Sequence, residues 1–258
     1  STEAVIEPKQ YFDFRAKIKN DDLIRKFVPD LKAFSTVNLY GSYNADLKNV
    51  TMYGSIPNVE YGAFVLNDIK LSAGNDEEQL NYELTLNEFN SEQFRLSNIG
   101  LTGFVANDLI DYNVQVKNDK DEVQYKIAGN VATANQLIDV TLKKDGLVLN
   151  YAPWNVTEDN KLTVYPKGIV ANNLQLFNNN SSILINSEGS SPEDPLNVAF
   201  KDFKIETLTE IIRKDSLLAE GTINGEAHIK DLMNDLRLTA DLNIKDLTKL
   251  DATLVEVF

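Results

Sequence analysis

The alternation of apolar and polar residues with a period of two is the feature that most constrains how this chain can fold. In an extended strand successive side chains point to opposite faces, so alternation produces one apolar and one polar face. Such runs recur along the 258-residue chain, among them Phe12–Ile18, Leu80–Leu86, Ile110–Val116 and Leu236–Ile244. Clusters rich in Asn, Asp, Gly and Ser separate the runs and are typical of turns. The pattern predicts an all-β fold of about 15 strands.

Helical patterns are few and short. One covers Asn20–Val28 and stops before Pro29, and Thr207–Lys214 opens with the spacing of a capping box. Lys230–Asn234 predicts one further turn. Because no shift in composition divides the chain, residues 1–258 are interpreted as a single repetitive β domain. The expected architecture is a long curved antiparallel sheet, groove-like, with two or three short helices.

An internal repeat is the most informative feature after the alternation. Leu66–Leu71 aligns with Leu96–Leu101 thirty positions later, and the register then holds without a gap through the following strands. Both hexapeptides read apolar, any, Asp or Asn, apolar, any, apolar, and we call this pattern the Asx cassette. Further copies are Leu47–Met52, Ala171–Leu176 and Phe200–Ile205.

The spacing within the Asx cassette predicts a local distortion of the strand. Its first two apolar residues, such as Leu66 and Ile69, are three positions apart, and a flat strand would put them on opposite faces. They share a face only if the strand accommodates an extra residue, as a β-bulge does, and bulges bend a strand. Gly inside strands, as in Tyr40–Ser42 and Ala128–Asn130, fits similar bends. The alternative is that the Asx residue starts a new strand after a turn; both interpretations leave a long antiparallel sheet.

The order of elements between Leu162 and Leu247 resembles that of bacterial AsmA/TamB-like proteins. Extended strand, short helix, Gly-containing strand and further strands follow one another there, with the Asx cassette among them. The resemblance implies a U-shaped, groove-forming sheet in the periplasm of Gram-negative bacteria, with roles in phospholipid transport and outer-membrane biogenesis. It also implies phospholipid acyl chains and outer-membrane assembly proteins as partners. The family's amino-terminal anchor helix has no counterpart here, so we expect a segment of a longer, membrane-anchored protein.

The apolar face of the sheet is the candidate functional surface. It can be an open, lipid-lined groove or the filled core of a sandwich, because alternation is the same in both. Few helical segments are available to cover a long sheet, which favours the groove. In the alignment of the two copies of the repeat, Leu80 corresponds to Ile110 and Tyr82 corresponds to Tyr112. The candidate groove residues are Leu80, Tyr82, Leu84, Leu86, Ile110, Tyr112, Val114 and Val116.

Composition excludes several classes of function. Lys and Arg total 25 against 39 Asp and Glu, for a net charge of −14, which argues against nucleic-acid binding and against docking on anionic headgroups. The absence of Cys excludes disulfides, thiol nucleophiles and thiolate metal sites. No run of 18 apolar residues predicts a membrane span, and there is no signal-peptide pattern. We expect no catalytic residues, no metal and no cofactor.

Individual residues that could carry chemistry have simpler structural interpretations. His228 is the single histidine and lies on the polar phase of a strand, so it is interpreted as an exposed strand residue. The acidic runs Asp76–Glu78 and Asn118–Glu122 could hold Ca²⁺ but lack the EF-hand spacing, and they also suit hairpin turns. Trp154 suits packing in the sheet better than ligand stacking.

Three functional hypotheses remain from the sequence. The first is a non-enzymatic periplasmic segment of an AsmA/TamB-like protein, in which acyl chains lie along the apolar face. The second is a structural or adhesive β-domain of a secreted protein that binds protein or glycan. The third is a glycan-active enzyme with a pair of carboxylates, although no pair is singled out by the sequence.

Overall fold

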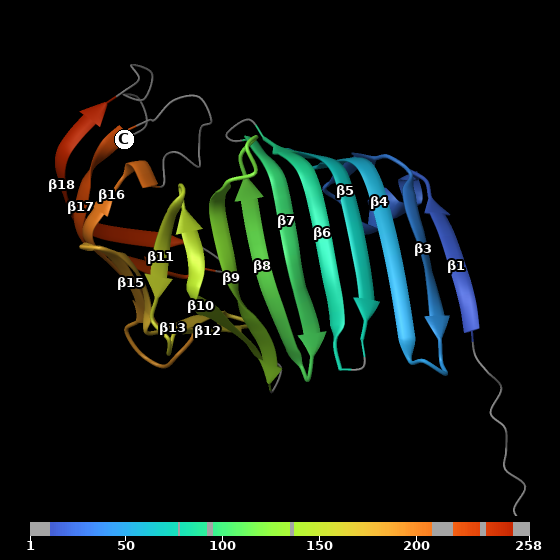
Figure 1. Ribbon diagram of the computed structural model, residues 1–258. Helices are drawn as coiled ribbons and strands as arrows, with labels where there is room; N and C mark the ends of the chain where they lie inside the picture. The colour runs from blue at the N-terminus through green and yellow to red at the C-terminus, as the bar shows by residue number, and fades with distance from the viewer. Residues whose placement is uncertain are drawn as a thin grey trace, which may run out of the picture. The chain divides into compact units, whose positions relative to one another are not determined.

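The protein is nearly all β, as predicted. A computed structural model describes residues 11–76, 78–91, 95–134, 137–207, 219–232 and 236–249. Within these residues lie 18 strands and the helix α1 (Asp22–Phe27), and all the strand ladders are antiparallel and open (Figure 1). The predicted helix near Leu208–Lys214 lies outside the described residues, as do the last two residues, Met233 and Asn234, of the predicted turn at Lys230–Asn234.

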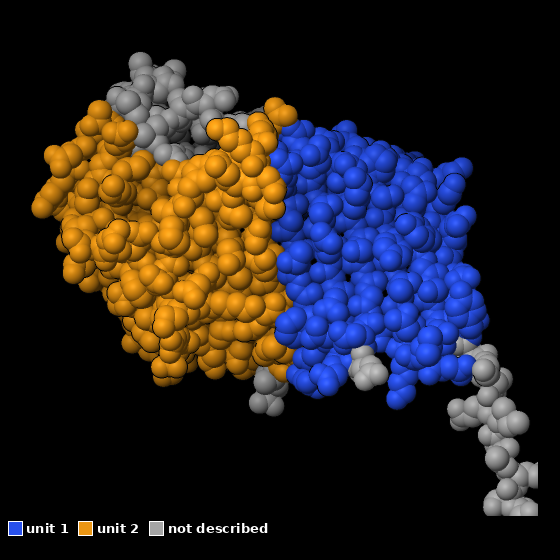
Figure 2. Space-filling view, in the orientation of Figure 1, with its two compact units in different colours: residues 1–91, 96–107 blue, residues 92–95, 108–258 orange. Residues whose placement is uncertain are grey.

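The chain forms two compact units, coloured separately in Figure 2. Unit 1 comprises residues 1–91 and 96–107, and unit 2 comprises residues 92–95 and 108–258. The strands of unit 1 are β1 (Tyr11–Ile18), β2 (Leu31–Phe34), β3 (Val37–Asn44), β4 (Asn49–Tyr61), β5 (Phe64–Asn75), β6 (Leu80–Asn90) and, apart from its first residue, β7 (Arg95–Ala106).

Unit 1 is a single layer of strands (Figure 1). β1 pairs with β3, β3 with β4, β4 with β5 and β5 with β6, while β2 pairs with the last residues of β4. The helix α1 links β1 to β2. Its N-cap is Asp21, whose carboxylate accepts a 2.8 Å hydrogen bond from the amide of Leu23. This short helix lies within the predicted range Asn20–Val28.

The register of these ladders aligns apolar residues in rows across one face of unit 1. One row runs from Leu39 opposite Gly54 to Leu71 and Leu84. The polar residues of the same strands form rows on the opposite face. We call these the apolar face and the polar face of unit 1. The alternation in the sequence therefore gives a sheet with one apolar and one polar face.

The Asx cassettes place a left-handed backbone conformation inside a strand at Asp68, Asn98 and Asp202, and between two successive strands at Asn173. Asp68, Asn98, Asn173 and Asp202 all have positive φ, between 44° and 55°. Asx residues tolerate this region better than other non-Gly residues because their short side chains bond locally. In the first cassette, Leu47–Met52, the positive φ falls on Lys48 instead. The cassette thus gives a kink within a strand in three copies and a turn that precedes a new strand in the copies at Lys48 and Asn173, so both interpretations of the sequence occur.

Two forms of the kink occur. At Asp202 the pairing of β16 with β17 shifts register between Phe200 and Phe203, as in a β-bulge. At Asp68 the register between β4 and β5 does not shift. Ile56 pairs with Ile69 on one side of the kink, and Asn58 pairs with Asn67 on the other. The neighbouring strands bend together, so apolar residues three positions apart stay on one face without an inserted residue.

Side-chain amides bridge the kink in unit 1. Asn58 donates a 2.9 Å hydrogen bond to Asn67, and Asn67 donates a 3.0 Å bond to Glu88. These bonds link β4, β5 and β6 on the polar face. They hold three bent strands in register where the backbone departs from regular extension.

The strands of unit 2 are β8 (Leu109–Lys117), β9 (Val123–Ala134), β10 (Leu137–Leu149), β11 (Ala152–Val156), β12 (Lys161–Tyr165), β13 (Gly168–Asn172), β14 (Leu174–Asn178), β15 (Ser181–Ser187), β16 (Leu196–Lys204), β17 (Ala219–Lys230) and β18 (Arg237–Lys249). β8, β9 and β10 pair in sequence order. The first half of β10 then pairs with β12, and its end pairs with β11. β11 also pairs with β14, and β14 to β18 follow in order.

Unit 2 contains a filled hydrophobic core where its sheet turns over on itself. The buried residues of this core come from β10, β11, β14, β15 and β16: Leu147, Trp154, Val156, Leu174, Ile183 and Phe203. The rings of Trp154 and Phe203 lie 5.9 Å apart in a tilted arrangement, typical of aromatic packing. Trp154 is therefore a core residue, as its sequence context suggested.

Some strand-interior glycines leave room for a side chain of the neighbouring strand and do not mark a bend. A Cβ on Gly41 would meet the ring of Phe14 at 2.8 Å, and a Cβ on Gly129 would meet the hydroxyl of Tyr112 at 2.5 Å. Only Gly221 and Gly225, both in β17, have the positive φ of a distorted strand. The predicted link between Gly and bending thus holds for β17, while Gly41 and Gly129 serve close packing.

Candidate functional site

The apolar face of unit 1 is largely uncovered. Among the described residues of this unit, Phe34 and Leu86 are the buried apolar side chains, and the rest of the face is half-exposed or exposed. The described part of unit 2, by contrast, buries twelve apolar side chains. Continuous exposed apolar surface is unfavourable in water and marks a surface that contacts a ligand or partner.

Aromatic and aliphatic side chains line this face from β1 to β6. The rings of Phe12 and Tyr43 lie 5.5 Å apart, and those of Phe64 and Phe89 stack at 5.1 Å. Between these pairs the rows consist mainly of Leu, Ile and Val. The face therefore offers a smooth, apolar lining with few hydrogen-bonding groups.

Four candidate residues lie on β6 of unit 1, as the alternation predicts. Leu80, Tyr82 and Leu84 are half-buried, Leu86 is buried, and the intervening Asn81 and Glu83 are exposed. In the ladder with β5, Tyr82 lies opposite Ala73, Leu84 opposite Leu71 and Leu86 opposite Ile69. These side chains are thus part of the apolar face.

The other four candidates lie on β8 of unit 2. Ile110 is 39% exposed, Tyr112 and Val114 are half-buried, and Val116 is buried with 8% exposed. Tyr112 lies opposite Gly129, and burial raises the pKa of its phenol above the ordinary value of 10.0. Ile127 on β9 and Ile138 on β10 are also exposed. This part of unit 2 carries an apolar surface outside its filled core.

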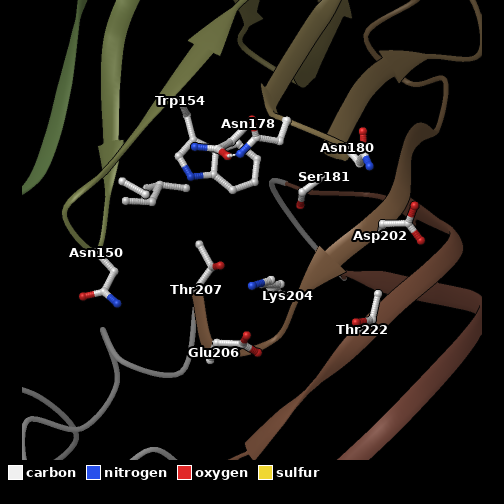
Figure 3. A pocket seen from close by; sticks show the side chains of 13 residues that line it. Asn150, Trp154, Asn178, Asn180, Ser181, Asp202, Lys204, Glu206, Thr207 and Thr222 are labelled. Carbon is white, nitrogen blue, oxygen red and sulfur yellow. Dashed lines mark hydrogen bonds between the residues drawn. The ribbon is translucent and has the colours of Figure 1, made fainter.

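A cavity of about 590 Å³ opens beside Trp154 in unit 2 (Figure 3). Leu149, Ala152 and Trp154 supply apolar lining, while Asp202, Lys204 and Glu206 supply charged groups. The Oγ of Ser181, which also lines the cavity, is buried and has no hydrogen-bond partner within the described part of the chain. The cavity can accept a small molecule with an apolar body and a polar edge.

The isolated residues noted in the sequence have structural roles. His228 is partly exposed, and its Nδ1 lies 2.6 Å from Glu188 Oε1, which joins β17 to the loop after β15. Asn118 receives the amides of Lys120 and Glu122 on its side-chain oxygen, as expected for a hairpin turn. In the described residues no cluster of three metal-ligating side chains occurs. No helix in the same residues is long and apolar enough to cross a bilayer.

Comparisons with known proteins identify no relative of this chain. No family model, no curated protein and no solved structure matches it.

Proposed function

We propose that the apolar face of unit 1 binds the acyl chains of phospholipids. The observation that supports this most is the contrast between the two units: unit 2 fills a core, whereas unit 1 leaves one face of its sheet largely uncovered. Acyl chains suit such a surface because their binding needs no specific polar contact, only removal of apolar area from water. Headgroups would remain in water at the border of the face.

On this proposal the protein is not an enzyme but a lipid-transfer segment. The resemblance to AsmA/TamB-like proteins supports a place in the Gram-negative periplasm, within a longer membrane-anchored chain that contributes to outer-membrane biogenesis. Outer-membrane assembly proteins are then its expected partners. Recovery of the full-length parent from its own host in membrane fractions, with this segment accessible to protease added to the periplasm, tests the location.

Lipid extraction tests the binding. Protein purified from cells is extracted with organic solvent, and the extract is analysed by mass spectrometry. We expect co-purifying phospholipid, and displacement of a fluorescent fatty acid from the delipidated protein by phospholipid. Protein free of lipid that also fails to bind the fluorescent fatty acid would contradict the proposal.

A matched pair of variants on β6 locates the binding face. Leu84 lies on the apolar face, and the next residue, Thr85, lies on the polar face opposite Lys70. Leu84→Asp places a charge among acyl chains and should abolish lipid binding while the protein stays folded, at a cost of about 1–3 kcal/mol in unfolding free energy. Thr85→Asp adds the same charge beside Lys70 and should leave lipid binding unchanged. A Leu84→Asp protein that does not fold would favour a closed core, and one that retains lipid would place binding elsewhere.

A further inference from the structure

An open hollow of about 560 Å³ lies on β1, β3 and β4 of unit 1. Its lining consists of Tyr40, Tyr53, Ser42, Thr51, Asp13 and Arg15, together with Phe14 and Gly41. The first six belong to the phase of their strands opposite to the apolar face, and only Phe14 and Gly41 belong to the apolar phase. The hollow therefore lies on the polar face and is separate from the proposed lipid-binding surface.

Two exposed aromatic rings form one wall of the hollow. Tyr40 and Tyr53 are direct cross-strand neighbours, and their rings stack with centroids 5.1 Å apart and planes 21° from parallel. They remain 50% and 43% exposed on a face that is otherwise polar. The pair thus presents fixed apolar ring surface and two phenolic hydroxyls to solvent.

Hydroxyl groups lie beside this wall. Ser42 Oγ and Thr51 Oγ1 are 2.9 Å apart and share one hydrogen bond. That bond uses one of the two hydroxyl protons, so the other proton and the remaining lone pairs can serve a ligand.

Two charged side chains of β1 complete the lining. Asp13 accepts a 2.9 Å hydrogen bond from the Tyr11 hydroxyl on one carboxylate oxygen, which leaves further acceptor capacity. Arg15 lies opposite Tyr40 in the ladder and brings a planar set of donors. Acceptors, donors and apolar ring surface therefore converge on one open site.

We propose that this hollow binds a neutral saccharide. A sugar ring combines an apolar face of C–H groups, which can contact the tyrosine pair, with a rim of hydroxyls that can bond Asp13, Arg15, Ser42 and Thr51. An acyl chain would leave these polar groups unpaired, which is costly. The net charge of −14 disfavours a polyanionic ligand. The protein would then hold lipid on one face of unit 1 and glycan on the other.

Isothermal titration with soluble neutral oligosaccharides tests the proposal, with maltohexaose, cellohexaose, laminarihexaose and chitohexaose as probes. We expect saturable binding of at least one. Tyr53→Ala should weaken it about ten-fold or more, as for truncation of an aromatic anchor. Thr51→Val keeps the side-chain shape without the hydroxyl and should weaken it less. Tyr61→Ala, on the same strand but outside the hollow, is the control and should bind normally.

Failure of all four oligosaccharides to bind would overturn the proposal. Binding that Tyr40→Ala and Tyr53→Ala leave unchanged would also overturn it. If the alanine variants do not fold, two other measurements test the proposal. They are the affinity of Thr51→Val for the oligosaccharide and the changes that the oligosaccharide causes in the amide chemical shifts of β1, β3 and β4 in the ¹⁵N-labelled wild type. Leu84→Asp should retain saccharide binding and Tyr53→Ala should retain lipid, so the two proposals can fail separately.

Discussion

Phe203 has no exposed surface, and its ring lies within 6 Å of two other aromatic rings in the core of unit 2. Truncation to Ala leaves a cavity that neighbouring strands can close only in part. We therefore expect Phe203→Ala to lower the free energy of unfolding by about 3–5 kcal/mol. Urea unfolding followed by fluorescence measures this directly, because Trp154 is the single tryptophan and lies in the same core. Phe27→Ala, at an 80% exposed position of α1, is the control and should change little.

Tyr112 makes the free energy of unfolding depend on pH in the alkaline range. Burial disfavours the charged phenolate and raises the pKa of Tyr112 in the folded state. Because the unfolded chain then loses this proton at lower pH, the stabilising contribution is complete below the unfolded pKa near 10 and is lost as pH rises through the folded pKa. Unfolding measured at intervals above about pH 9 should therefore show a shallower loss of stability for Tyr112→Phe than for the wild type. Equal slopes would mean that the phenol ionises freely in the folded protein.

At the scale of the strand, the Asx cassettes at Asp68, Asn98 and Asp202 introduce kinks inside β5, β7 and β16. The kink at Asp68 keeps apolar residues three positions apart on one face, and this continues the apolar rows past the bend. In the ladder between β4 and β5, Asn58 and Asn67 also bond across the kink. A kink of this kind requires a residue that tolerates positive φ.

Asp68 tests that requirement. Its φ is 55°, so Asp68→Gly should keep or slightly raise stability, whereas Asp68→Val should lower it by about 1–2 kcal/mol. Both variants lose the exposed Asp68–Lys70 ion pair, which contributes little. The difference between them therefore isolates the backbone conformation. Urea unfolding followed by far-ultraviolet circular dichroism gives both values, and a Val variant as stable as the Gly variant would show that the kink is not left-handed.

At the scale of the whole molecule, stability and the proposed ligand surfaces lie in different parts of the chain. The filled core belongs to unit 2, while unit 1 has an uncovered apolar face and a polar face with a hollow. Strands that pack on both sides open less readily than strands with exposed faces. Local stability should therefore be uneven.

Hydrogen exchange measures this unevenness. We expect backbone amides of β15, which pairs on both edges and contributes Ile183 to the core, to exchange among the slowest. Amides of β18 should exchange much faster, because the side chains described for this strand are exposed on both faces. Comparable protection in the two strands would indicate that something not seen here covers β18.

Alternation alone was enough to predict the strand class, the two faces of each strand and the placement of Leu84 and Tyr82 on the apolar one. The apolar spacing within the Asx cassette also predicted distortions at Asp68, Asn98 and Asp202, and all three residues have the positive φ that Asx residues adopt at little cost. It did not distinguish a kink that preserves register from a bulge that shifts it. That distinction depends on whether the neighbouring strand bends at the same level.

Only the tertiary structure decided which apolar faces are covered. Leu84 and Ile183 lie in equally alternating strands, yet Leu84 stays half-exposed and Ile183 is buried, because only the second faces another layer of sheet. The tyrosine pair was also missed from sequence, although Tyr-Gly-Ser occurs at both Tyr40 and Tyr53. Local pattern fixes the side of a strand on which a residue lies. What stands opposite it depends on contacts between residues distant in sequence, which a period of two does not encode.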